Sequence, residues 1–140
     1  MNKSPESTNR ATGITLTQEF LLMKTRQSLP QIVKLNLWGN DLGDVSILKQ
    51  VPNLEVLALT VNQISTLADF GQCHKLKELY LRRNNIPAKA SELRHLKGLA
   101  HLKVLNLGEN PISSQLPGYR LLVLKTLPDL EKLDDVAVSY

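Results

Sequence analysis

Leucine and isoleucine recur along this chain with one fixed spacing. In the stretch that starts at Leu54, apolar residues fill the first, fourth, sixth and eleventh places, and the ninth is an asparagine. The same arrangement occurs four times, at residues 32–42, 54–64, 76–86 and 102–112. The alternation of apolar and other residues in the middle of each frame predicts a short β-strand with its leucines turned inward.

The asparagines show that these frames form one repeat. They stand at positions 40, 62, 84 and 110, so the spacings are 22, 22 and 26 residues, within the roughly 20–29 residues of leucine-rich repeats. The predicted fold is therefore an α/β leucine-rich-repeat solenoid, with a short parallel sheet on its concave face and helices or turns on its convex face. We expect each asparagine amide to bind backbone groups of its own turn and of the next coil.

The other half of each repeat should fill the core from the convex side. Leu67 and Phe70 do so in one coil, and Leu93, Leu96 and Leu99 in the next. The third repeat is longer, and between residues 88 and 99 its apolar residues recur every three positions with charged residues between them. We interpret this segment as a full α-helix.

Both ends of the solenoid have candidate caps, which an exposed repeat core requires. At the start, Thr15 and Gln18 have capping-box spacing, and a helix with Leu16, Phe20, Met23 and Gln27 on its inner face should cover the first strand, with Pro30 helping to end it. At the end, residues 113–139 form the expected C-terminal cap, marked by Tyr119, Leu127, Pro128, Leu130 and Leu133.

These boundaries predict a single capped domain over residues 13–140, preceded by a flexible tail over residues 1–12. The tail has no apolar periodicity. Because both ends of the solenoid are capped, we expect the domain to be monomeric.

Composition and charge narrow the functional classes. The 17 basic and 13 acidic residues are interspersed, so the net charge of +4 permits nucleic-acid binding without arguing for it. No apolar run approaches the ~18 residues of a membrane span, and the polar start lacks a signal-peptide core, which favours an intracellular protein. The lone Cys73 has no disulfide partner and is expected to be a packing residue.

No catalytic or metal motif emerges from the sequence. His74, His95 and His101 lie outside the strands without a second ligand at zinc-like spacing, and the glycines form no phosphate-binding loop. The adjacent pair Asp134 and Asp135 falls in the C-terminal cap, where turn or helix capping explains it. We therefore expect a protein that is not an enzyme and that needs no cofactor and no metal.

The outward strand positions form the candidate binding surface. Apolar and aromatic residues are more frequent there than on a solvated sheet, and tryptophan, tyrosine and arginine often carry interface energy. The candidate partner-binding residues are Trp38, Val56, Ala58, Tyr80, Arg82, Val104 and Asn106. Arg82 has open space beside Gly108 and could reach a carboxylate or phosphate of the partner, or instead lie across Tyr80. Arg83 and Glu109 should pair with each other.

Several segments go beyond the repeat frame and carry a family resemblance. They include residues 34–40, 61–67, 78–84 and the cap residues 119–128, with Trp38, Tyr80, Arg82 and Arg83 as the specific positions. From about residue 14 to 138 the chain resembles a family of cilia- and flagella-associated leucine-rich-repeat proteins. The resemblance implies a non-enzymatic component of the cytoplasm, the cytoskeleton and the basal body or ciliary base that supports cilium or flagellum assembly, with the nucleus as a second location.

The resemblance also implies a NIMA-related kinase as a partner and a link to DNA-damage repair. The family's C-terminal helical oligomerisation region is absent from these residues, so the resemblance implies an N-terminal domain and places kinase binding in a region not present here. Two alternatives stay open: a spliceosomal subunit similar to the small-nuclear-ribonucleoprotein A-prime protein, and a phosphatase regulator built from longer arrays of 22-residue repeats.

Overall fold

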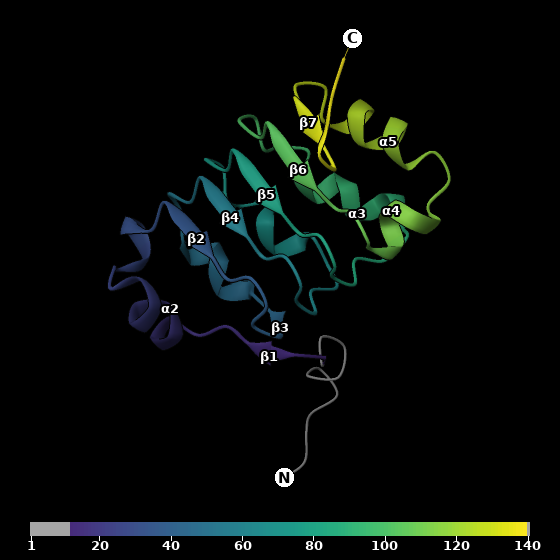
Figure 1. Cartoon of the computed structure of the whole chain (residues 1–140). Helices are drawn as coiled ribbons and strands as arrows, with labels where there is room; N and C mark the ends of the chain where they lie inside the picture. The colour runs from purple at the N-terminus through teal and green to yellow at the C-terminus, as the bar shows by residue number, and fades with distance from the viewer. Residues whose placement is uncertain (1–11, 140) are drawn as a thin grey trace.

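A six-stranded sheet runs the length of the molecule, and a computed structural model describes it over residues 12–139 (Figure 1). Five strands are parallel and the last is antiparallel, in the order β2-β4-β5-β6-β7-β8. Their bounds are β2 Lys34–Asn36, β4 Val56–Ala58, β5 Glu78–Tyr80, β6 Val104–Asn106, β7 Lys132–Leu133 and β8 Val136–Ala137. The four predicted frames each contain one of the first four strands, which confirms the solenoid.

The inward leucines stack in register along the sheet. Leu35 pairs with Leu57, Leu57 with Leu79, Leu79 with Leu105 and Leu105 with Leu133, and all five are buried. One column of leucines therefore passes through every coil, so each repeat buries its apolar face only by contacting its neighbours.

Side-chain hydrogen bonds join neighbouring coils just after the strands. They involve the row of repeat asparagines, which we call the asparagine ladder and which consists of Asn40, Asn62, Asn84 and Asn110. The Asn84 amide donates to the carbonyls of Leu59 and Leu81, both at 3.0 Å, and its Oδ1 accepts from the Ile64 N–H at 2.9 Å. Asn62 and Asn110 make the same kinds of bond to the coil that precedes each of them. The bonds confirm the predicted structural role at these three positions, where they run to the preceding coil. The Asn40 amide differs from the prediction, because it donates only within its own turn.

The residue just before each ladder asparagine adopts a left-handed backbone, at Gly39, Val61, Arg83 and Glu109. Val61, with φ of 60°, is β-branched, and this conformation costs a side chain of that kind roughly 1–2 kcal/mol. Val61→Asn should therefore raise the free energy of unfolding by about 1 kcal/mol in urea denaturation. Val104→Asn, on an ordinary strand, is the control, and an equal rise there would contradict the interpretation.

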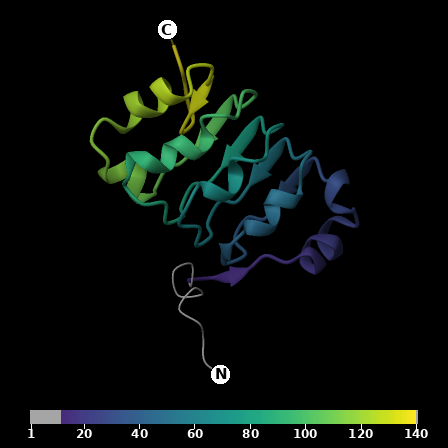
Figure 2. The ribbon, with the colours of Figure 1, turned by 180° about the vertical axis from the view of Figure 1, so that it is seen from behind.

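Short helical segments return the chain on the far side of the sheet (Figure 2). They are η2 Ser46–Gln50, η3 Ala68–Phe70, α3 Ala90–Leu93 and η4 Arg94–Leu96. Leu67, Phe70, Leu93, Leu96 and Leu99 are buried, as predicted.

The prediction of a full α-helix between residues 88 and 99 was wrong. One α-helical turn, α3, passes directly into the 3₁₀ turn η4, and Leu99 N–H bonds the carbonyl of Leu96, three residues back. A 3₁₀ turn has three residues per turn, so it aligns residues spaced by three on one face. The three-residue spacing of Leu93, Leu96 and Leu99 favours that geometry over a continuous α-helix.

The N-terminal cap contains a helix, but its start and inner face differ from the prediction. The elements are β1 Ile14–Thr15, α2 Gln18–Thr25, η1 Leu29–Gln31 and β3 Leu42–Asp44, and β1 pairs with β3 in a separate two-stranded sheet. Thr17 is the N-cap of α2, and its Oγ1 accepts from the Phe20 N–H at 3.1 Å. Thr15, the predicted cap, lies in β1, since pairing with β3 holds the chain extended up to that point.

The buried face of α2 consists of Leu21 rather than Phe20 and Met23. Leu16 and Leu21 are buried, while Phe20 is exposed and Met23 is 77% exposed. The helix ends at Arg26, which has a left-handed backbone, so Gln27 never joins it and Pro30 belongs to η1. The shift of two residues in the cap rotates the helix relative to the predicted face. Residues 1–11 of the predicted tail lie outside the described residues.

The C-terminal cap closes the sheet with a side-chain oxygen. In the earlier coils, the N–H groups of Leu37, Leu59 and Leu81 donate to a backbone carbonyl of the next strand. The Leu107 N–H instead donates to Asp134 Oδ1 at 2.6 Å. The φ angles of Asp134 and Asp135, 51° and 69°, then reverse the chain into β8, which confirms their predicted role in a turn.

Two short helices complete this cap: α4 Pro111–Gln115 and α5 Tyr119–Thr126. The Tyr119 hydroxyl donates to the second oxygen of Asp134 at 2.7 Å, which ties α5 to the turn. Burial, with this hydrogen bond as a second cause, raises the pKa of Tyr119. None of the helices within residues 12–139 is long and apolar enough to cross a membrane.

Cys73 is a buried packing residue, as predicted. Burial, and to a lesser degree the charge of Asp69, raises the pKa of its thiol to about 11. Because the thiolate is the reactive form, we expect Cys73 to react with a thiol reagent near neutral pH only as the domain unfolds. In urea, the rate at which a chromogenic disulfide reagent labels Cys73 should therefore equal the rate of unfolding. Rapid labelling of the native domain would contradict this expectation, because it would show that the thiol is accessible.

Candidate protein-binding face

We call the surface made by the outward side chains of β2, β4, β5 and β6, and by the residues two places after the last residue of each strand, the sheet face. Figure 1 shows these four strands side by side. Parallel register sets the first row of the sheet face as Lys34, Val56, Glu78 and Val104, and its second as Asn36, Ala58, Tyr80 and Asn106. Neighbouring strands lie ~4.8 Å apart. This surface is the predicted concave face, and the register confirms which side chains share it.

Trp38 is the most accessible large apolar residue of the sheet face. Its side chain is 62% exposed, while Val56, Ala58, Tyr80 and Val104 are half-buried. The Trp38 backbone N–H donates to Asn36 Oδ1 at 3.1 Å, which holds the chain at the end of β2. An exposed indole next to a half-buried apolar strip is typical of a protein-interaction surface, in which tryptophan often provides much of the binding energy.

Tyr80 is oriented by a neighbour that the sequence analysis did not single out. Its hydroxyl donates to Glu78 Oε1, two residues earlier on the same side of β5. This hydrogen bond to a carboxylate, together with partial burial, raises the pKa of Tyr80 to about 12. The hydrogen bond directs the Tyr80 hydroxyl toward Glu78, along the first row of the sheet face.

Arg82 was predicted to reach a carboxylate or phosphate of a partner beside Gly108, and it instead pairs with a carboxylate of this chain. Arg82 Nη2 binds Glu109 Oε2, and Arg83 Nε binds Glu109 Oε1 at 2.7 Å, so both arginines share one carboxylate. Only the Arg83–Glu109 pair was predicted. Hydrogen bonding from Arg83, followed by Arg82, lowers the pKa of Glu109. Glycine at position 108 leaves room for the Arg82 stem to reach across to β6.

Asn106 also differs from its predicted role. It is buried, at 6% exposure, because its Oδ1 accepts from the Gly108 N–H at 2.9 Å and its amide donates to Asp135 at 3.2 Å. Its side chain stabilises the end of β6 instead of facing a partner. Asp135 belongs to the C-terminal cap, and the periodicity of the strands does not predict that it contacts Asn106.

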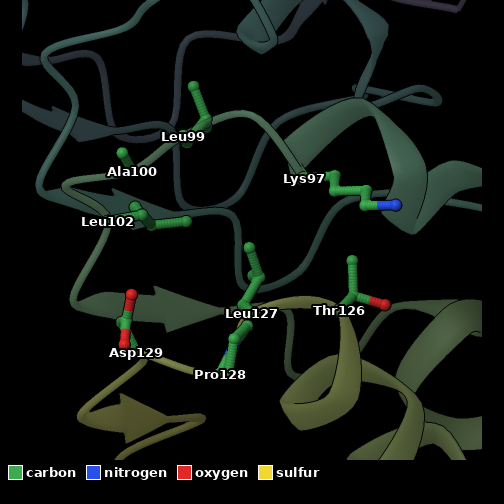
Figure 3. A pocket seen from close by; sticks show the side chains of 8 residues that line it. All are labelled: Lys97, Leu99, Ala100, Leu102, Thr126, Leu127, Pro128 and Asp129. Atoms are coloured by element: carbon green, nitrogen blue, oxygen red, sulfur yellow. The ribbon is translucent and has the colours of Figure 1, made fainter.

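A small pocket of about 250 Å³ lies away from the sheet face (Figure 3). Buried Leu99, Leu102 and Leu127 line it, and Lys97 and Asp129 lie on opposite sides of it. Thr126, also in its lining, donates its hydroxyl to the Leu122 carbonyl. The lining therefore pairs no nucleophile with a base.

The remaining candidate groups for chemistry are dispersed. His74, His95 and His101 are all exposed. Within residues 12–139, no three histidine, cysteine or acidic side chains come together in a way that could hold a metal ion. The sheet face is thus the surface whose geometry supports a function.

Comparison with known proteins places the chain in a family. A leucine-rich-repeat profile matches residues 30–86, and a second matches residues 101–119. Together with the fold, these matches show that the chain belongs to the leucine-rich-repeat family.

Within that family, the repeat domain is similar to one particular group, which confirms the resemblance found in the sequence. It is 51% identical to human cilia- and flagella-associated protein 410 over 89% of the chain and 49% of that protein. The mouse protein of the same name is 48% identical over 89% of the chain and 50% of that protein. The chain therefore spans about half the length of these curated relatives.

Solved structures agree with the fold. A chain in the crystal structure of the Drosophila melanogaster SNF/U2A′ complex superposes with a TM-score of 0.73 and 26% identity, covering 91% of this chain and 70% of that one. A Leptospira interrogans leucine-rich-repeat protein gives a TM-score of 0.66 and 29% identity, over 86% of this chain and 28% of that one.

Proposed function

We propose that this domain is a non-enzymatic protein-binding module of the basal body or ciliary base, where it acts as a scaffold in cilium or flagellum assembly. The similarity to cilia- and flagella-associated protein 410 supports the cellular setting. The leucine-rich-repeat fold, whose sheet offers an extended surface, supports protein binding.

The observation that carries the binding proposal is the exposure of Trp38 at the edge of a half-buried apolar strip. Val56, Ala58 and Tyr80 continue that strip over the neighbouring strands. A partner that covers the strip would bury the indole, and buried aromatic anchors commonly dominate interface energy. The proposed partner-binding residues are therefore centred on Trp38 and Tyr80. Arg82, which the pair with Glu109 holds beside them, is proposed as a further contact.

The cellular part of the proposal is tested by imaging a fluorescently tagged protein in ciliated or flagellated cells. Signal concentrated at the basal body is the expected result. The alternative function, an adaptor similar to the spliceosomal A-prime protein, is favoured by the superposition on the SNF/U2A′ structure. Signal confined to nuclear speckles would support that alternative and contradict the ciliary proposal.

Association with a NIMA-related kinase belongs to a different part of the proposal. Because the chain spans about half of its curated relatives, we assign that association to the whole protein and not to the sheet face.

The binding surface is tested by a triple variant, Trp38→Ala, Tyr80→Ala and Arg82→Ala. We expect this variant to lose the partners recovered by the wild-type bait while its melting temperature falls little, since the side chains point away from the leucine core. Truncation at an interface centre costs ~2 kcal/mol or more per anchor residue. Quantitative mass spectrometry of recovered partners is the measurement.

Met23→Ala is a matched control, because Met23 is even more exposed than Trp38 but lies on α2 in the N-terminal cap. Tyr80→Phe separates the ring from its hydrogen bond to Glu78. Full recovery of every partner by the triple variant would exclude the sheet face as the binding surface.

A further inference from the structure

The C-terminal cap carries a second candidate surface, a groove of about 710 Å³ between α5 and the chain that follows β8. Its lining is mostly apolar and includes Pro117, Leu121, Leu122, Leu124, Lys125 and Ser139. The volume lies within the range of roughly 300–1,000 Å³ that is common for ligand-binding clefts. Figures 1 and 2 both show α5 beside the C-terminal segment, at the opposite end of the sheet from β2.

Leu121 is the most exposed of the leucines that line this groove. Its side chain is 76% exposed, whereas Val123 is fully buried and anchors α5 on the core. Leu122 and Leu124 are half-buried and pack partly against that core. Covering this exposed leucine with another apolar surface lowers the free energy, because it removes apolar area from water.

Lys125 is the one charged residue among those that line the groove. Residues 111–127, which form α4 and α5, contain Arg120 and Lys125 and no aspartate or glutamate. Lys125 follows Leu121 by four residues on α5, so the two side chains are neighbours on one helix face. The groove therefore presents an aliphatic surface next to an ammonium group, and its charge complement is a carboxylate.

We propose that this groove binds an acidic amphipathic segment of a partner protein. Aliphatic side chains of that segment cover Leu121 and Leu124, and one of its carboxylates binds Lys125. This is helix-in-groove recognition, in which apolar anchors at helical spacing provide contact and a charge sets orientation. The surface is separate from the sheet face, so the domain could bind one partner on each of the two surfaces.

The test uses a fluorescently labelled synthetic peptide with leucines at helical spacing and glutamates on its other face, titrated with the full chain by fluorescence anisotropy. A second peptide carries lysine at every glutamate position. We expect the acidic peptide to bind and the basic one not to bind. Leu121→Ser and Lys125→Glu should each weaken binding of the acidic peptide by about tenfold or more.

Matched controls come from the other end of the chain. Leu22 and Lys24 are an exposed leucine and an exposed lysine on α2, so Leu22→Ser and Lys24→Glu repeat the same chemical changes far from the groove. Both should leave the affinity within about twofold of the wild-type value. The sheet-face variant Trp38→Ala should also bind normally, which separates this proposal from the proposed function.

Three results would overturn the proposal. The first is absence of binding, and the second is equal binding of the acidic and basic peptides or equal weakening by the α2 controls. The third is a dimer in light scattering that Leu121→Ser dissociates, since the groove would then hold a second copy of the chain.

Discussion

Replacing Leu81 by alanine should lower the free energy of unfolding by about 2–5 kcal/mol, the range found when a large aliphatic side chain is deleted from a close-packed core. Leu81 is fully buried and follows β5 directly, between the coils of β4 and β6. Alanine keeps its backbone bonds, including the one from its N–H to the Asn106 carbonyl. The loss should therefore come from the removed apolar contacts and the cavity that they leave, and not from broken backbone hydrogen bonds.

Urea denaturation followed by circular dichroism measures this effect, with an unchanged m-value showing that the unfolding transition is the same. Leu121→Ala is the matched control: it removes the same atoms from an exposed position and should change the free energy of unfolding by less than about 0.5 kcal/mol. If the two variants were equally stable, the inward register of the strands would be wrong.

The second large effect should come from Asn110→Ala, which we expect to cost at least about 3 kcal/mol. The Asn110 amide donates to the carbonyls of Leu81 and Leu107, and its Oδ1 accepts from the Ile86 N–H. The side chain is buried, so water does not readily replace it, and each unsatisfied buried backbone group costs about 1–3 kcal/mol.

Asn40→Ala tests the same chemistry at the start of the ladder. The Asn40 amide donates only within its own turn, to the Trp38 carbonyl at 3.1 Å, and the residue is partly exposed. Its replacement should cost less than about 1 kcal/mol. Equal losses at the two positions in thermal or urea unfolding would show that bonds between coils contribute little.

The repeat could be predicted because each of its features depends on local periodicity. Strand alternation and the position of Asn84 follow from residues a few places apart, and the stacking of identical coils then determines their surroundings. The pairing of Arg83 with Glu109 could be predicted for the same reason, since both occupy equivalent positions on neighbouring coils.

What the sequence did not predict depends on contacts between non-equivalent segments. Asn106 points outward by alternation, yet Asp135 from the C-terminal cap binds its amide. Arg82 seemed unopposed because the residue facing it is Gly108, but a flexible arginine reaches the next available carboxylate, that of Glu109. In α2, pairing of β1 with β3 displaced the helix start, and the buried face moved to Leu21.

The carboxylate of Asp134 also bears on how this molecule behaves at high concentration. An open-ended stack of parallel strands can act as a template on which further copies add head to tail, which is the usual route to fibres. Here the Leu107 N–H, the last one that could donate to a following parallel strand, is bound by the Asp134 side chain. The final strand, β8, runs in the opposite direction. The β2 strand of another copy therefore meets an edge that does not continue the repeat, and we expect no head-to-tail polymerisation along the solenoid axis.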